Sequence, residues 1–95
     1  MRVILDDAAS DDLDKIHAWM AQDRLAVADT VIERILTATE RLGRFPHIGH
    51  IGRVRSTYEW VVSGLPYIIV YELVPERNEL IVTGIFHGAQ RNRRP

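Results

Sequence analysis

The spacing of apolar residues changes near residue 43 of this chain, and that change restricts the possible folds more than any other feature. From residue 8 to residue 42, apolar side chains recur at intervals of three and four, which is the spacing of one helix face. From residue 58 to residue 86 they alternate with polar residues or form short continuous runs, as strands do. Helices and strands therefore occupy separate segments, as in an α+β fold.

The first half of the chain predicts one strand and a helical hairpin. Residues 2–5 are a β-branched run that ends at two aspartates. Two helical stripes follow, one from Ala8 to Met20 and one that ends at Leu42, with Asp23 as the expected N-cap of the second helix and Gly43 as its stop. Only a few polar residues separate the stripes, which favours a hairpin of two helices.

The second half predicts three further strands. Residues 58–63 alternate, residues 67–71 form a continuous apolar run, and residues 80–86 form another apolar strand. The turns between them are short, so these strands form an antiparallel meander with 67–71 at its centre. We expect an α+β fold with an N-terminal strand, a helical hairpin and then a three-stranded antiparallel meander, in a single domain over residues 1–95.

The composition of the chain excludes several kinds of chemistry and indicates a cellular environment. The chain has no cysteine, which excludes disulfides, thiolate metal sites and cysteine nucleophiles. Its N-terminus lacks the pattern of a secretory signal, and its apolar runs are too short to span a bilayer. We expect a cytoplasmic protein that contacts no membrane and needs no cofactor.

Charge is unevenly distributed although the net charge is only −1. Residues 1–40 hold nine acids and four bases, whereas residues 41–95 hold four acids and eight bases, all of them arginine. Arginine forms bidentate contacts with phosphate and carboxylate groups and stacks on flat surfaces. The second half is therefore the better candidate for binding an acidic partner, although a solvated basic face is an equally simple interpretation.

The order of these elements resembles the ParE/RelE toxin fold of type II toxin-antitoxin systems, and local features sharpen the resemblance. It extends over nearly the whole chain, and its ending is closer to the ParE branch than to the RelE branch. The residues that carry it are Ala9, Asp12, Leu13 and Ile16 in the first helix, then Leu42, Pro46, Gly49 and Arg55, then the segments 65–71 and 85–91.

This resemblance implies a toxin that arrests growth and is neutralised by a cognate antitoxin in a hetero-oligomer. ParE-like members inhibit DNA gyrase by trapping its cleaved-DNA state, whereas RelE-like members cut messenger RNA on the ribosome. A shared fold does not decide between these targets. We expect the gyrase inhibitor, which is not itself an enzyme, with target-binding residues Arg53, Arg55, Arg91, Arg93 and Arg94, provided that the loop and the tail converge.

The alternative is a ribosome-dependent endoribonuclease that uses His87 as its catalytic acid together with the arginines. Cleavage would need preorganised cations around the scissile phosphate. RelE-like toxins carry an arginine in the central strand, but residues 67–71 contain no charge, and Gly84 stands where many relatives carry another arginine. A third possibility is an inactive relative that only binds antitoxin.

His87 also has a structural interpretation, as a strand-end residue that hydrogen-bonds the backbone and packs on Tyr71 or Trp60. His47 and His50 lie three residues apart in a glycine-rich loop, but no further ligand is close in sequence, so we expect no metal site.

Overall fold

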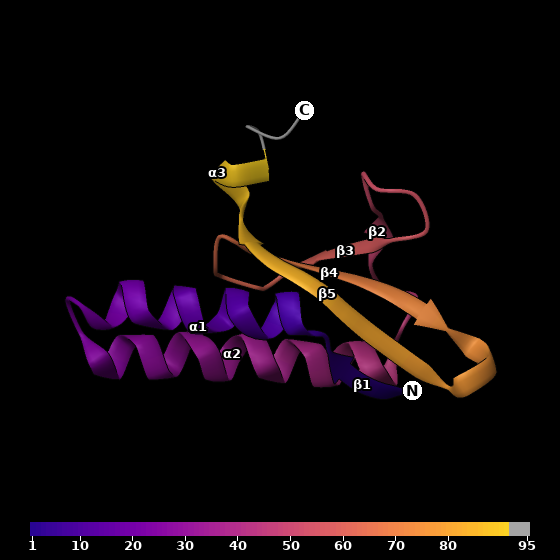
Figure 1. Ribbon diagram of the computed structural model, residues 1–95, viewed down its shortest axis with the longest axis horizontal. Helices are drawn as coiled ribbons and strands as arrows, with labels where there is room; N and C mark the ends of the chain where they lie inside the picture. Colours follow the sequence, from indigo (N-terminus) through magenta and orange to yellow (C-terminus); the bar gives the residue numbers. More distant parts are fainter. Residues whose placement is uncertain (92–95) are drawn as a thin grey trace.

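The computed structural model describes residues 1–91, and its elements follow the expected order (Figure 1). The α+β class, the helical hairpin and the antiparallel meander are confirmed. Three short elements were not predicted, the two-residue strand β2, the three-residue 3-10 helix η1 and the four-residue helix α3. The elements are β1 (Arg2–Leu5), α1 (Asp7–Ala21), α2 (Leu25–Arg44), β2 (His50–Ile51), β3 (Tyr58–Val61), β4 (Tyr67–Val74), η1 (Pro75–Arg77), β5 (Glu79–His87) and α3 (Gly88–Arg91).

The five strands form one sheet in the order β1-β5-β4-β3-β2. The apolar run that begins β4 occupies the middle, as expected, and pairs antiparallel with both β3 and β5. β1 pairs in parallel with β5, from Arg2 opposite Glu79 to Leu5 opposite Val82. The N-terminus therefore lies near the turn that joins β4 to β5 (Figure 1).

The core lies between the helical hairpin and one face of the sheet. From α2, Ile35 and Leu42 are completely buried, and from the sheet Ile69, Tyr71 and Val82 are completely buried against them. Burying each such side chain stabilises the fold by about 1.5–3 kcal/mol relative to its exposed state. Among the described residues, no helix is both long enough and apolar enough to cross a lipid bilayer.

The ends of α2 differ from the sequence prediction. Its N-cap is Arg24 rather than Asp23, and the cap side chain makes no hydrogen bond to the helix. Gly43 does not stop the helix, which continues to Arg44. A Cβ at Gly43 would lie 2.7 Å from the Val3 side chain, so this glycine allows the close approach of β1 instead.

A β-bulge in β5 decides which side chains face the helices. Val70 pairs with Gly84 and Tyr71 pairs with Val82, so Thr83 is the extra residue. Before the bulge Val82 faces the helices, and after it Ile85 does. An extra residue shifts the alternation by one, which reverses the two faces for the rest of the strand.

The bulge coincides with the end of β1 and the beginning of α1. β1 covers the edge of β5 only as far as Val82, whose carbonyl accepts from the Asp6 N–H at 3.0 Å. Beyond this point Asp12 of α1 replaces the strand, because its Oδ2 accepts from the Ile85 N–H at 2.9 Å. A helix side chain thus satisfies a backbone donor that no neighbouring strand reaches.

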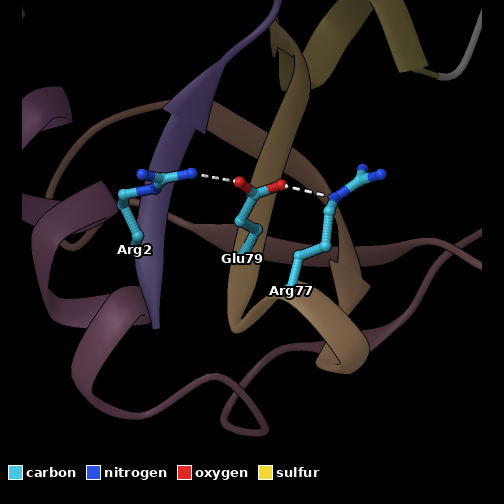
Figure 2. Close-up of polar contacts among 3 residues, drawn as sticks. All are labelled: Arg2, Arg77 and Glu79. Atoms are coloured by element: carbon cyan, nitrogen blue, oxygen red, sulfur yellow. Dashed lines mark hydrogen bonds and ion pairs between the residues drawn. The ribbon is translucent and has the colours of Figure 1, made fainter.

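A cluster of two arginines and one glutamate holds the other end of β1 to β5. Figure 2 shows the Glu79 carboxylate between Arg2 and Arg77. Arg77 Nε lies 2.9 Å from Glu79 Oε1, and Arg2 Nη2 donates a hydrogen bond to Glu79 Oε2. The Glu79 side chain is buried, while both arginines remain largely exposed. The hydrogen bond from Arg2, and then that from Arg77, hold the pKa of this carboxyl below its ordinary value of 4.5.

Replacing Glu79 with Gln should make folding stability less dependent on acidic pH. The folded-state pKa is the lower one, so the ionised carboxylate stabilises the fold above pH 4.5, and this contribution is lost as the pH falls from there through the folded-state pKa. Urea unfolding should therefore show Glu79→Gln to be less stable than the wild type at neutral pH, with a gap that narrows in acid. Glu76→Gln, at an exposed position in the same turn, is the matched control. A gap that stays constant with pH would contradict the assignment.

Replacing Asp12 with Ala should lower the free energy of unfolding by about 1–2 kcal/mol, because the Ile85 N–H loses its acceptor. Asp12→Asn keeps a side-chain oxygen and should lose less. Asp11→Ala, one residue earlier and exposed, serves as the control in the same urea titrations. Equal stability of the Asp12→Ala and Asp11→Ala variants would show that the hydrogen bond does not hold the bulge.

Candidate functional site

The predicted target-binding arginines fall into two groups. Arg53 and Arg55 are exposed on the loop between β2 and β3. Arg91 is the last residue of α3, while Arg93 and Arg94 lie outside the described residues. The structure therefore brings Arg53 and Arg55 together on one loop, and the convergence of loop and tail stays a prediction.

The segment that leads into this loop is anchored by the buried Tyr71 hydroxyl. This hydroxyl donates to the Pro46 carbonyl at 2.9 Å and accepts from the Gly49 N–H at 3.1 Å. Burial raises the pKa of Tyr71, which keeps the hydroxyl protonated and able to donate. Pro46 and Gly49 are among the residues that carry the resemblance to the ParE/RelE toxins. Both contact Tyr71 of the middle strand.

Local hydrogen bonds shape the loop itself. The Gly52 N–H donates to the Thr57 carbonyl at 2.8 Å, and the Thr57 hydroxyl donates to the Val54 carbonyl at 2.6 Å. The Arg53 N–H donates to Glu59 Oε2 at 3.0 Å, which ties the loop to β3. Arg53 and Arg55 are therefore carried by a backbone with fixed hydrogen bonds.

This loop borders a cleft of about 460 Å³ on the face of the sheet that points away from the helical core, which we call the far face. Two acidic residues, Asp12 and Glu72, line the cleft, and Arg55 is its only basic lining residue within residues 1–91. A phosphate would thus meet more negative than positive charge there. The lining residues are Ala8, Asp12, Val54, Arg55, Thr57, Val70, Glu72, Thr83, Gly84 and Phe86.

His87 lies on the opposite face of the sheet from Arg55. It pairs with Tyr67 at the end of β5, and the two rings meet edge to face with centroids 5.6 Å apart. Its Nδ1 accepts from the Ala89 N–H at 3.0 Å. The backbone hydrogen bond matches the structural interpretation of this histidine, but its packing partner is Tyr67 rather than Tyr71 or Trp60.

The surroundings of His87 form a small cleft of about 340 Å³ lined by Lys15, Ile16, Trp19, Tyr67 and His87. Burial raises the pKa of Tyr67, so this hydroxyl is a poor base near neutral pH. The phosphate-binding arginines that the nuclease hypothesis requires are absent from this lining within the described part of the chain. His87 and Arg55 thus belong to two separate clefts.

A third feature, a groove between α2 and β3, contains arginines that were not predicted as binding residues. It has a volume of about 610 Å³, and Arg34, Arg41 and Arg44 line it beside Trp60. The signal was present, because arginines seven and then three residues apart lie on one side of a helix. The predicted binding arginines all lie after residue 50.

Comparison with known proteins identifies the class. The family model described as the ParE toxin of the type II toxin-antitoxin system, parDE, matches residues 3–92. The protein Y4kP of Sinorhizobium fredii (strain NBRC 101917 / NGR234), whose name describes it as a candidate toxin, is 38% identical over 79 residues, which are 83% of this chain and 79% of the relative.

Solved structures agree in fold. A chain of the chromosomal ParDE system from P. aeruginosa superposes with a TM-score of 0.79 at 16% identity, covering 92% of this chain and 95% of the other. A chain of the intact E. coli RelBE toxin-antitoxin complex superposes with a TM-score of 0.69 at 16% identity, covering 90% and 94%.

The fold and the match to toxins define a type II toxin of the ParE/RelE class. Within that class, the chain belongs to the ParE toxin family.

Replacing Tyr71 with Phe should lower the free energy of unfolding by about 1–2 kcal/mol, because the Gly49 N–H and the Pro46 carbonyl both lose a partner. Tyr58→Phe is the matched control, since Tyr58 stacks on Tyr71 at 5.5 Å and no hydrogen bond involves its hydroxyl within residues 1–91. Urea unfolding measures stability, and hydrogen exchange of the Gly49 amide should accelerate only in Tyr71→Phe. Unchanged exchange in that variant would contradict the anchoring role.

Proposed function

We propose that this toxin arrests growth by binding DNA gyrase and blocking its turnover, and that a cognate antitoxin neutralises it. The membership of the ParE family supports gyrase as the target, since that is what the family resemblance implies. The proposal treats the chain as a binding protein that inhibits an enzyme without catalysing a reaction.

The observation that carries the proposal is the charge of the cleft on the far face. A nuclease of the RelE type would need several preorganised cations around a phosphate, and each missing donor costs roughly 3 kcal/mol of barrier. Among the described lining residues, Arg55 faces two acids, and the strands contribute Val70, Gly84 and Phe86. His87, the alternative catalytic acid, lines a different cleft. These placements favour binding over phosphodiester cleavage.

Arg55 is suited to contact an acidic surface of the target. Its side chain is exposed, and the loop that carries it is held by hydrogen bonds at both ends. A charge presented on a preorganised loop contributes to association without a large ordering cost. Arg53 lies beside it, and we propose that Arg91, Arg93 and Arg94 extend the same surface.

Structures with the same fold support an antitoxin as a partner of this chain. The similar structures come from a ParDE toxin-antitoxin system and from an intact RelBE toxin-antitoxin complex. We propose that this chain likewise forms a hetero-oligomer with its antitoxin.

The purified toxin should inhibit DNA supercoiling by purified gyrase, and Arg55→Glu should raise the concentration that gives half inhibition roughly tenfold, or about 1.4 kcal/mol. The reversed charge would repel the acidic surface that the wild-type residue attracts. Arg24→Glu, an exposed arginine at the far end of the helical hairpin, should inhibit like the wild type. Pre-bound antitoxin should relieve the inhibition.

Failure of folded, antitoxin-binding toxin to inhibit gyrase at high excess would overturn the proposed target. Ribosome-dependent cleavage of a transcript that is lost in His87→Ala would then support the nuclease alternative. Normal growth on induction of the soluble toxin without antitoxin would support the inactive relative.

A further inference from the structure

The cleft that contains His87 also contains a buried hydroxyl group without a partner in the described part of the chain. Tyr67 is only 4% exposed and lines this cleft. Its ring packs against His87, but its hydroxyl forms no hydrogen bond with any residue of 1–91. The hydroxyl oxygen keeps some contact with solvent, and the cleft is the opening that Tyr67 lines. Buried polar groups are normally hydrogen-bonded, so this hydroxyl points to a ligand that enters the cleft.

The groups around this hydroxyl supply hydrogen-bond donors. Burial raises the pKa of Tyr67, which keeps its hydroxyl protonated. Lys15 adds a cation that can only donate. The Nδ1 of His87 already accepts from the Ala89 N–H, so this nitrogen offers no acceptor to an incoming molecule. The cleft is therefore suited to a ligand whose polar atoms accept hydrogen bonds and whose charge is negative.

The wall of the cleft that belongs to α1 includes a large aromatic surface. Trp19 is 69% exposed, and it lines the cleft together with Ile16. Lys15 precedes Trp19 by four residues in α1, which places both on one face of the helix. A single exposed apolar residue needs no explanation, but this one borders a cleft and has a cation one turn away. A planar ligand can stack on Trp19 while its charged end reaches Lys15.

Each of three other clefts contains a carboxylate. The groove between α1 and α2, on the outer side of the hairpin, is lined by three acids, and the cleft of the far face is lined by two. The groove between α2 and β3 is basic but includes Glu33, and Arg34 in this groove already donates to the Ser63 carbonyl. The cleft of Tyr67 has no acid among its described lining residues. A small anion therefore meets no opposing charge there.

The size and charge of the cleft restrict the ligand further. Its volume of about 340 Å³ lies at the lower end of the range for ligand pockets, about 300–1,000 Å³. Lys15 is the only lysine or arginine in its lining within residues 1–91. One cation balances a carboxylate, whereas a phosphate monoester carries a charge of about −1.5 to −2 and would retain an unbalanced charge in the cleft. A planar ring with one carboxylate fits these limits.

We propose that this cleft binds a small aromatic carboxylate, with its ring against Trp19 and its carboxylate between Lys15 and the Tyr67 hydroxyl. The ligand connects the first helix to the middle of the sheet, because Lys15 and Trp19 belong to α1 and Tyr67 begins β4. The site depends neither on gyrase nor on an antitoxin, and Arg55 lies outside it.

Indole-3-carboxylate is the probe, and the neutral indole-3-carboxamide is its matched control because it keeps the shape and loses the charge. Labelling the full chain with 5-fluorotryptophan reports the location, since the two tryptophans line different clefts. In fluorine NMR the carboxylate should shift the Trp19 resonance and leave that of Trp60 unchanged, with Trp19→Phe and Trp60→Phe as assignment variants. We expect a dissociation constant of about 1 mM or lower, and about tenfold weaker binding of the carboxamide.

Two substitutions separate recognition from folding. Tyr67→Phe removes only a hydroxyl without a partner in residues 1–91, so the fold should persist while the dissociation constant of indole-3-carboxylate rises about tenfold. Lys15→Met should weaken binding of the carboxylate by about the same factor but leave binding of the carboxamide unchanged. Tyr58→Phe and Arg24→Met, both outside the cleft, should bind the carboxylate like the wild type.

The contrary results are equally specific. A shift of Trp60 alone, or unchanged affinity in Tyr67→Phe, would overturn the location of the site. Tighter binding of adenosine monophosphate than of indole-3-carboxylate would overturn the carboxylate as the ligand chemistry. Absence of any shift with the probe, in folded protein whose Trp19 resonance shifts with antitoxin, would identify a protein as the occupant and overturn the proposal. None of these readouts involves gyrase, so the proposed function and this site can fail separately.

Discussion

The extra residue in β5 is the constraint on which the arrangement of the clefts depends. Because side chains alternate across a strand, the insertion of Thr83 reverses which residues face the helices after Gly84. Ile85 then completes the core and His87 meets Tyr67, while Phe86 turns to the far face. A regular strand would place His87 on the side of Arg55, and the two clefts would have a different chemistry.

The bulge is stable because three local features meet there. β1 ends opposite Val82, α1 begins at Asp7, and Asp12 accepts the hydrogen bond of the Ile85 N–H that β1 no longer covers. Edge strands expose such donors, and proteins must satisfy or cover them. The first helix therefore covers the edge of the sheet in addition to filling the core. Asp12 performs the first of these roles, because its carboxylate accepts the hydrogen bond at the uncovered edge of β5.

Sequence patterns predicted the elements but could not predict how their faces are assigned. The change of period near residue 43 and the run at residues 67–71 are local signals, so the hairpin and the meander followed from them. The bulge leaves no comparable trace, since residues 80–86 are apolar on both sides of Thr83. Gly43 was misinterpreted for a similar reason, because its role depends on a contact with Val3, which is distant in sequence.

The candidate site could be predicted only in part. Arg53 and Arg55 lie two residues apart, so the sequence alone places them on one loop. The groove of Arg34, Arg41 and Arg44 exists only because β3 packs beside α2, which the sequence does not reveal.

Acidic and basic residues gather on separate surfaces of the helical hairpin. One face of α2 lines an acidic groove on the outer side of the hairpin through Asp29 and Glu33, while Arg34, Arg41 and Arg44 line the basic groove on the side of β3. The loop that carries Arg55 belongs to neither groove, because Tyr71 and Glu59 hold it to the meander. Opposite charges on adjacent faces of one helix attract and repel a charged molecule on different sides of the hairpin. The orientation of a charged molecule on the hairpin therefore depends on repulsion by Asp29 and Glu33 as well as on attraction by the arginines.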